Sequence, residues 1–151
     1  MKALVLVHVL SAIIGIGPTF FTHVLTRPSQ NVEQLKVSMA LYQRLEFFPK
    51  IGGSLALLTG FILFFAGDYG PFTQLWIAGS FTLYLLIQLS VFLLINPNAK
   101  KVSTWLTLPE NEFLTGAPPE EIQRHLSLFN RYMYMTSALG VLLFICMILK
   151  P

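Results

Sequence analysis

The chain has 151 residues, of which 54% are hydrophobic and only 11% are charged, and its mean hydropathy is +0.66. This composition excludes an ordinary soluble domain and predicts a single-domain, all-α, polytopic membrane protein. The net charge is +3, but six of the seven carboxylates lie in the same segments as most of the basic residues, so no nucleic-acid-binding surface is expected.

Four apolar runs are each long enough to cross the hydrocarbon core of a bilayer, which takes about 20 helical residues. They are residues 4–25, 48–66, 75–95 and 128–149. Such alternating crossings predict four transmembrane helices in an antiparallel bundle. The lipid bilayer is therefore the expected partner of most of the surface.

The distribution of basic residues predicts the orientation of the bundle. Of the ten Lys and Arg residues, eight lie in the connections after the first and third runs or at the polar starts of the next helices: Arg27, Lys36, Arg44, Lys50, Lys100, Lys101, Arg124 and Arg131. Short segments rich in Lys and Arg remain in the cytoplasm. We therefore expect a multi-pass protein of the inner (plasma) membrane with both termini outside the cytoplasm.

The first run has one face made of small and polar residues, and its other sides are large and apolar. At the helical period this face holds His8, Ser11, Ala12, Gly15, Thr19, Thr22 and His23. Small residues allow helices to approach closely in a membrane, so this face is expected to point into the bundle. Gly17 and Pro18 predict a kink in the same helix.

Residues 29–47 have apolar side chains at helical spacing with charged ones between them. The pattern predicts an amphipathic helix lying along the cytoplasmic interface. Asn31 and Gln34 have the spacing of a capping pair at its start.

Proline and glycine mark the remaining boundaries. Residues 67–71 predict a tight external turn between the second and third spans. Asn96-Pro97-Asn98 is expected to end the third span and to open an irregular connection that runs through Gly116. Two prolines followed by Glu120 and Glu121 predict the start of the fourth helix.

His8 is the first candidate for a functional residue. It lies about 9 Å into the first helix at 1.5 Å per residue, where water is scarce and a polar side chain needs a partner. Residues at its depth come from the start of the third span and the end of the fourth, including Lys150 if that side chain bends inward. The alternative is that a neutral His8 donates to a backbone carbonyl, to Ser80 or to Tyr84.

His23 and His125 both lie near the cytoplasmic side, on different helices. They are a candidate pair of axial ligands for a b-type haem in the bundle core. The alternative is that both are interfacial residues hydrogen-bonded to backbone or to lipid headgroups. Tyr84 and Gln88, at four-residue spacing, are expected to form interhelical hydrogen bonds or to contact the edge of a porphyrin or quinone.

Several function classes are disfavoured. The single cysteine, Cys146, excludes an intrachain disulfide and a covalently attached c-type haem. The sequence contains no Ser-His-Asp order, glycine-rich phosphate loop or metalloprotease motif. The spans contain no carboxylate except Glu46 at an edge, which argues against a proton-driven transporter.

Three motifs resemble a known group of proteins. The first run reads Lys2-Ala-Leu-x-x-x-His8 and continues to Gly15-x-Gly17, the second contains Leu57-Leu58-Thr59-Gly60, and the fourth ends at Lys150-Pro151. In these features the chain resembles the HemJ-type protoporphyrinogen oxidases and the related CopD-like and uncharacterised small bacterial integral-membrane proteins. The resemblance implies a four-helix fold and a b-type haem tied to His8, with Lys150 at a matching position.

The chain departs from that pattern in its first helix. The tryptophan and arginine expected there are absent, and Ile16 and Gly17 or Phe21 and Thr22 stand in their place. The resemblance therefore implies the fold more strongly than oxidase activity. The chain is most similar to the uncharacterised proteins of this group, for which the resemblance implies no activity.

Two functions from different classes are compatible with these features. One is a small membrane redox or haem-metabolism protein that holds haem b through His8 or through His23 and His125. The other is a non-enzymatic accessory subunit whose small-residue faces pack against another membrane protein or a second copy.

Overall fold

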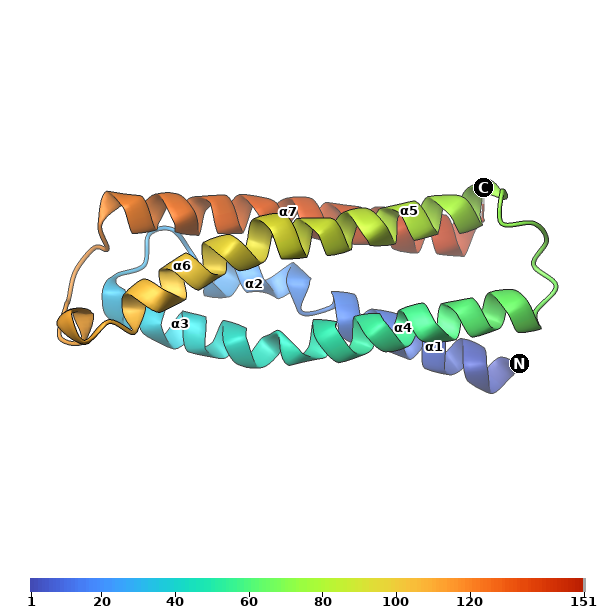
Figure 1. Cartoon of the computed structure of the whole chain (residues 1–151), viewed down its shortest axis with the longest axis horizontal. Helices are drawn as coiled ribbons and strands as arrows, with labels where there is room; N and C mark the ends of the chain where they lie inside the picture. The colour runs from blue at the N-terminus through green and yellow to red at the C-terminus, as the bar shows by residue number, and fades with distance from the viewer. Residues whose placement is uncertain (151) are drawn as a thin grey trace.

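The computed structural model describes residues 1–150 and is built from helices and turns, with no β-strand in that range (Figure 1). Its elements are α1 (Lys2–Ile16), α2 (Thr19–Leu25), α3 (Val32–Leu45), α4 (Phe47–Ala66), α5 (Leu75–Ser90), the π turn η1 (Val91–Ile95), α6 (Asn96–Leu106), the 3₁₀ turn η2 (Pro109–Asn111) and α7 (Glu120–Leu149). The all-α prediction is confirmed.

The helices join into four columns: α1–α2, α3–α4, α5–η1–α6 and α7. Each column is long and apolar enough to cross a membrane. Figure 1 shows them side by side in an elongated bundle, with both termini and the α4–α5 connection at one end. We call this end the hairpin end and the opposite end, which holds α3, α6 and the start of α7, the basic end.

The predicted kink in the first span is confirmed. α1 ends at Ile16, and α2 begins at Thr19 after Gly17 and Pro18. The hydroxyl of Thr19 donates to the carbonyl of Ile16 at 2.6 Å, and the hydroxyl of Thr22 donates to the carbonyl of Pro18 at 2.9 Å. Local side chains thus satisfy backbone carbonyls at the break, as apolar surroundings require.

The predicted amphipathic helix forms as α3, but it does not lie along an interface. Asn31 and Gln34 make both hydrogen bonds of the predicted capping box. The apolar face of α3 packs against α6 and α7, and only Glu46 separates α3 from α4, so the two helices run on as one column. α3 takes this place because α6 and α7 continue beyond their apolar spans and offer it an apolar partner.

The core of the molecule lies at the basic end. It consists of Val32, Leu35, Met39, Tyr42, Ile95, Ala99, Val102, Leu106, Ile122, Leu126, Phe129 and Met133. Phe129 is fully buried, and its ring meets the Tyr42 ring edge-on at 5.0 Å between centroids. Such dense packing fixes the relative positions of α3, α6 and α7.

The expected stop at Asn96-Pro97-Asn98 is wrong, because the third column continues as helix to Leu106. The π turn η1 precedes Pro97, which stands in the first turn of α6. Proline has no backbone N–H to donate. Pro97 lies just after the π turn, where the hydrogen-bond pattern changes between two helical segments. Burial of Ile95, Ala99 and Val102 against α7 then holds the continuation in place.

Candidate functional site

The two halves of the bundle differ in how tightly their helices pack. In the hairpin half, α1 packs closely on α4 and α5 packs closely on α7, while the described backbones of these two pairs approach each other at few points. A cavity of about 600 Å³ lies between the pairs and is lined mostly by apolar side chains. We call it the slot. Its volume is within the range of cofactor and ligand sites, about 300–1,000 Å³.

Glycines set the distance between α1 and α4. A Cβ added at Gly15 would lie 2.6 Å from the backbone nitrogen of Gly53, and one added at Gly52 would lie 2.5 Å from the nitrogen of Gly15. Such contacts are far inside van der Waals distance, so only glycine fits at either position. The small-residue face of the first helix therefore points into the bundle, as predicted.

A few polar side chains break the apolar lining of the slot: His8, Tyr69, Trp76, Ser80, Tyr84 and Lys150. His8, Tyr84 and Lys150 were candidates from the sequence. All three line the slot, which lies between the α1–α4 pair and the α5–α7 pair. The hydrogen-bond partners of His8 lie instead on α4, in the second span, so the alternative from the sequence, a His8 that donates to a backbone carbonyl, is the one observed.

His8 is held to α4 through one ring nitrogen. Its Nδ1 lies 2.9 Å from the carbonyl oxygen of Ala56 and 3.1 Å from the hydroxyl of Thr59. A carbonyl oxygen can only accept, so Nδ1 carries the proton. The unprotonated Nε2 makes no hydrogen bond within residues 1–150. Histidines that bind metal usually donate their other N–H to a carbonyl or a carboxylate in this way.

Thr59 and Gly60 shape the surroundings of His8, a role that the sequence reasoning missed. Thr59 is buried and contacts Nδ1, and its own hydroxyl donates to the carbonyl of Leu55 at 2.6 Å. A Cβ added at Gly60 would lie 3.1 Å from Cε1 of His8, so glycine leaves room for the imidazole. Residues 57–60 form one of the motifs that carry the resemblance, and Gly60 also belongs to a small-residue face of the second span, but neither pattern indicates a histidine neighbour.

Tyr84 and Gln88 lie where α5 faces α4. The hydroxyl of Tyr84 donates to the carbonyl of Gly53 at 3.3 Å, which is an interhelical hydrogen bond of the expected kind. Gln88 lies beside the same glycine, since a Cβ added at Gly53 would be 3.6 Å from its Nε2. Gln88 is not part of the slot lining, whereas Tyr84 is.

Lys150 carries positive charge to the hairpin end of the slot. It follows α7 with a left-handed backbone, φ 47° and ψ 53°. Its Nζ lies 5.1 Å from the ring centroid of Trp76 and 5.8 Å from that of Tyr69. These are cation–π distances, so two aromatic rings hold the ammonium group where the slot meets the end of the bundle. The inward bend considered from the sequence is present.

His23 and His125 are not brought together. The His23 ring stacks on Tyr134 at 4.3 Å between centroids, and its Nδ1 is buried without a hydrogen-bond partner in the described chain. His125 bonds through Nδ1 to Asn98 at 2.7 Å, on the opposite face toward α6. Tyr134 is nine residues, or about 13 Å, further along α7 than His125. The two imidazoles therefore face different neighbours, and the structure does not support them as ligands of one haem iron.

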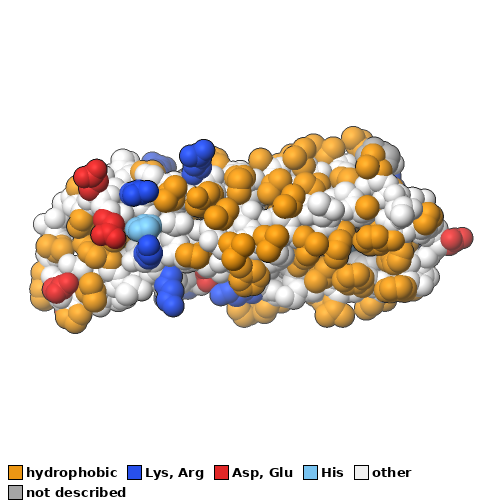
Figure 2. All heavy atoms as spheres, turned by 45° about the horizontal axis from the view of Figure 1, so that its top comes forward, with side chains coloured by type: hydrophobic (Ala, Val, Ile, Leu, Met, Phe, Trp, Pro, Cys, Tyr) orange, Lys and Arg blue, Asp and Glu red, His pale blue; other side chains and the backbone are white. Residues whose placement is uncertain are grey.

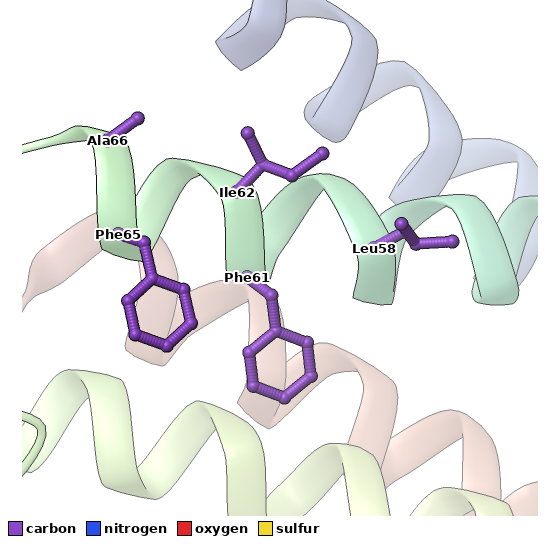
Figure 3. A pocket seen from close by; sticks show the side chains of 5 residues that line it. All are labelled: Leu58, Phe61, Ile62, Phe65 and Ala66. Carbon is purple, nitrogen blue, oxygen red and sulfur yellow. The ribbon is translucent and has the colours of Figure 1, made fainter.

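A second, shallow pocket lies on the outer face of α4. Its lining is entirely apolar and comes from α4 alone: Leu58, Phe61, Ile62, Phe65 and Ala66. Figure 3 shows these side chains spread along the helix with no polar group among them. The pocket offers no group for chemistry, and its surface suits lipid contact.

The comparisons with known proteins agree with this architecture. A family model described as "Predicted integral membrane protein (DUF2269)" matches residues 2–151. No curated protein and no solved structure matches the chain. The match covers all four columns and supports an integral membrane protein. The finer resemblance to HemJ-type and CopD-like proteins stays a prediction.

Proposed function

We propose that this chain, which belongs to the DUF2269 family of predicted integral membrane proteins, is a haem-associated membrane protein that holds haem b in the slot through His8. The observation that carries the proposal is the state of His8. Its Nδ1–H donates to the carbonyl of Ala56, so Nε2 of this slot-lining imidazole has no hydrogen-bond partner within residues 1–150, in a cavity that is mostly apolar. A lone imidazole nitrogen in such surroundings is a ready axial ligand.

The slot suits the remaining features of haem. Haem b is a flat, largely apolar molecule that carries carboxylates on one edge. The apolar lining accommodates the macrocycle, and the Lys150 ammonium offers a charge partner for carboxylates at the hairpin end. When bound, haem supplies one-electron redox chemistry, while the chain supplies the axial nitrogen, a dry cavity and the positive charge.

The groups around His8 tune the imidazole for this role. The hydrogen bond to Ala56 fixes the tautomer and makes Nε2 a stronger donor of its lone pair. Gly60 leaves space for the ring beside α4. Turnover of a porphyrin, as in protoporphyrinogen oxidases, is a finer possibility that rests on the sequence resemblance alone.

The alternative of an accessory subunit gains no support from the small-residue face of the first helix. Gly15 and Gly52 are used against each other, and a Cβ at Gly140 would lie 2.8 Å from the side chain of Ile16. These three glycines pack against other residues of the same chain. No other observation favours that function.

The test is the visible spectrum of the protein purified in mild detergent from haem-replete cells, with and without dithionite. We expect a Soret band, with α and β bands that sharpen on reduction, and we expect His8→Ala to lose at least nine-tenths of the absorbance. His23→Ala and His125→Ala are the matched controls and should keep it, because their rings lie outside the slot. A colourless wild-type protein, or an unchanged spectrum in a folded His8→Ala variant, would overturn the proposal.

A further inference from the structure

Basic side chains form a band across one face of the bundle. Figure 2 shows Lys and Arg side chains gathered between the apolar surface toward the hairpin end and a group of acidic side chains at the tip of the basic end. A histidine side chain lies among them in this view. The band shares no residue with the lining of the slot, so its role is independent of the proposed haem site.

The most concentrated part of the band lies on α6 and α7, and we call it the basic patch. It consists of Lys100, Lys101, Arg124, His125 and Arg131, and its four Lys and Arg side chains are exposed. Lys101 Nζ lies 3.4 Å from Nε2 of His125, which joins the two helices. Arg124 and Arg131 are seven residues apart on α7, so they share a face at about 10 Å separation.

The basic patch has no carboxylate in salt-bridge contact within residues 1–150. Across residues 1–150 the single ion pair is Lys50 with Glu46, away from the patch. Even Glu120 and Glu121, one turn before Arg124, form no ion pair with it. Exposed cations that share a surface without carboxylate partners attract an external anion.

The basic patch lies at the edge of the membrane-spanning surface. Residues 132–149 of α7 contain no charged side chain, and these 18 residues are about 27 Å long, close to the thickness of the hydrocarbon core. Arg131 therefore stands at headgroup level. On the neighbouring column, Phe92 and Leu93 are 65% and 66% exposed, just before α6 begins.

We propose that the basic patch binds the headgroups of anionic phospholipids, with the acyl chains along the exposed apolar surface of η1 and α7. A patch for a soluble anion or an acidic protein needs no apolar border, whereas this one continues directly into lipid-facing side chains. The phosphate lies against Lys101, Arg124 and Arg131, and the hydrogen-bonded pair of His125 and Asn98 supports Lys101 from behind.

The test measures lipid binding to the purified full chain in detergent by native mass spectrometry, with phosphatidylglycerol and phosphatidylcholine as probes. Each basic residue near an anionic lipid surface contributes about a fivefold preference. Lys101→Gln with Arg131→Gln should therefore weaken phosphatidylglycerol binding about 30-fold and leave phosphatidylcholine binding unchanged. The control pair, Lys2→Gln with Arg44→Gln, removes the same charge elsewhere and should change binding less than threefold.

Three results would overturn the proposal. The first is equal binding of the two lipids by the wild-type protein. The second is wild-type affinity for phosphatidylglycerol in the patch variant. The third is binding of glycerol 3-phosphate, which lacks acyl chains, as tightly as the lipid, since that would identify a soluble phosphate as the ligand. Thermal unfolding of both double variants in lipid-free detergent shows whether they remain folded.

Discussion

Asn130 is the most fully enclosed amide of the membrane bundle, and it ties the end of α2 to α7. Its side chain is 5% exposed. Its Nδ2 donates to the carbonyls of Thr26 and Leu126, and its Oδ1 accepts from the hydroxyl of Thr26. All the described hydrogen bonds of this amide are thus made inside the protein, at the point where the first column ends.

Replacing Asn130 with Leu should lower the free energy of unfolding by about 1–2 kcal/mol, because the carbonyl of Thr26 would lose its side-chain donor and remain buried. Thermal unfolding in detergent measures the loss. Thr73→Ala is the control, since that residue is exposed and its side chain makes no hydrogen bond in the described structure. Equal stability of Asn130→Leu and wild type would show that the amide contributes nothing.

The histidines show how far a single residue can be interpreted from sequence. Depth alone separated His8 from His23 and His125, and the structure agrees that only His8 lines the slot. A hydrogen bond from His8 to a backbone carbonyl was one of the expected alternatives, but its partners Ala56 and Thr59 were not predictable, because they depend on the rotation of α1 against α4. A helical wheel gives the face of one helix and leaves the facing residues of its neighbour open.

At the scale of elements, the packing of α1 on α4 offers a matched pair of neighbouring glycines. Gly52 lies against the backbone of Gly15, and a Cβ there would be 2.8 Å from the carbonyl oxygen of Ser11 as well. The next residue, Gly53, points elsewhere, and the atom nearest to its added Cβ is Nε2 of Gln88 at 3.6 Å. Identical substitutions one residue apart therefore test backbone approach alone.

Gly52→Ala should lower the free energy of unfolding by about 1–3 kcal/mol, because α1 and α4 must move apart to accept the methyl group. Gly53→Ala should raise it slightly or leave it unchanged, because alanine favours the helix by up to about 1 kcal/mol over glycine. Both effects are read from thermal unfolding in the same detergent. Equal destabilisation by the two substitutions would contradict the close approach of α1 and α4.

The helix ends show where sequence patterns mislead. The start of α7 and the break at Pro18 were predictable, since proline and early carboxylates act locally. Pro97 was wrongly expected to end the helix. A π turn precedes it, and burial of Val102 and Leu106 stabilises the helix beyond it. The residues that bury Val102 and Leu106 lie on α3 and α7, so the local sequence around Pro97 does not indicate them.

At the scale of the whole molecule, one end of the bundle is tightly packed and the other contains a cavity between its helix pairs. The basic end is held by the core around Phe129, and the hairpin end contains the slot. The number of spans was predictable because hydropathy reports it directly. The upright position of α3 was not, because an amphipathic pattern looks the same whether its apolar face meets lipid or protein.

The orientation of the whole bundle in the membrane is open to a direct test. The hairpin end has Lys2, Asp68 and Lys150 as its charged side chains, whereas the basic end holds the band of cations. The positive-inside rule therefore predicts that the basic end faces the cytoplasm. Single cysteines introduced as Thr73→Cys and Thr115→Cys, in a Cys146→Ser background, place one thiol in the connection at each end of the bundle.

In intact cells, a membrane-impermeant maleimide should label the Thr73→Cys protein and leave the Thr115→Cys protein at least tenfold less labelled. Permeabilisation should make both proteins equally reactive, since both positions are exposed. The Cys146→Ser background protein without an added cysteine measures the unspecific signal. The reverse pattern would place the basic patch outside the cell and turn the hairpin end, with Lys150, toward the cytoplasm.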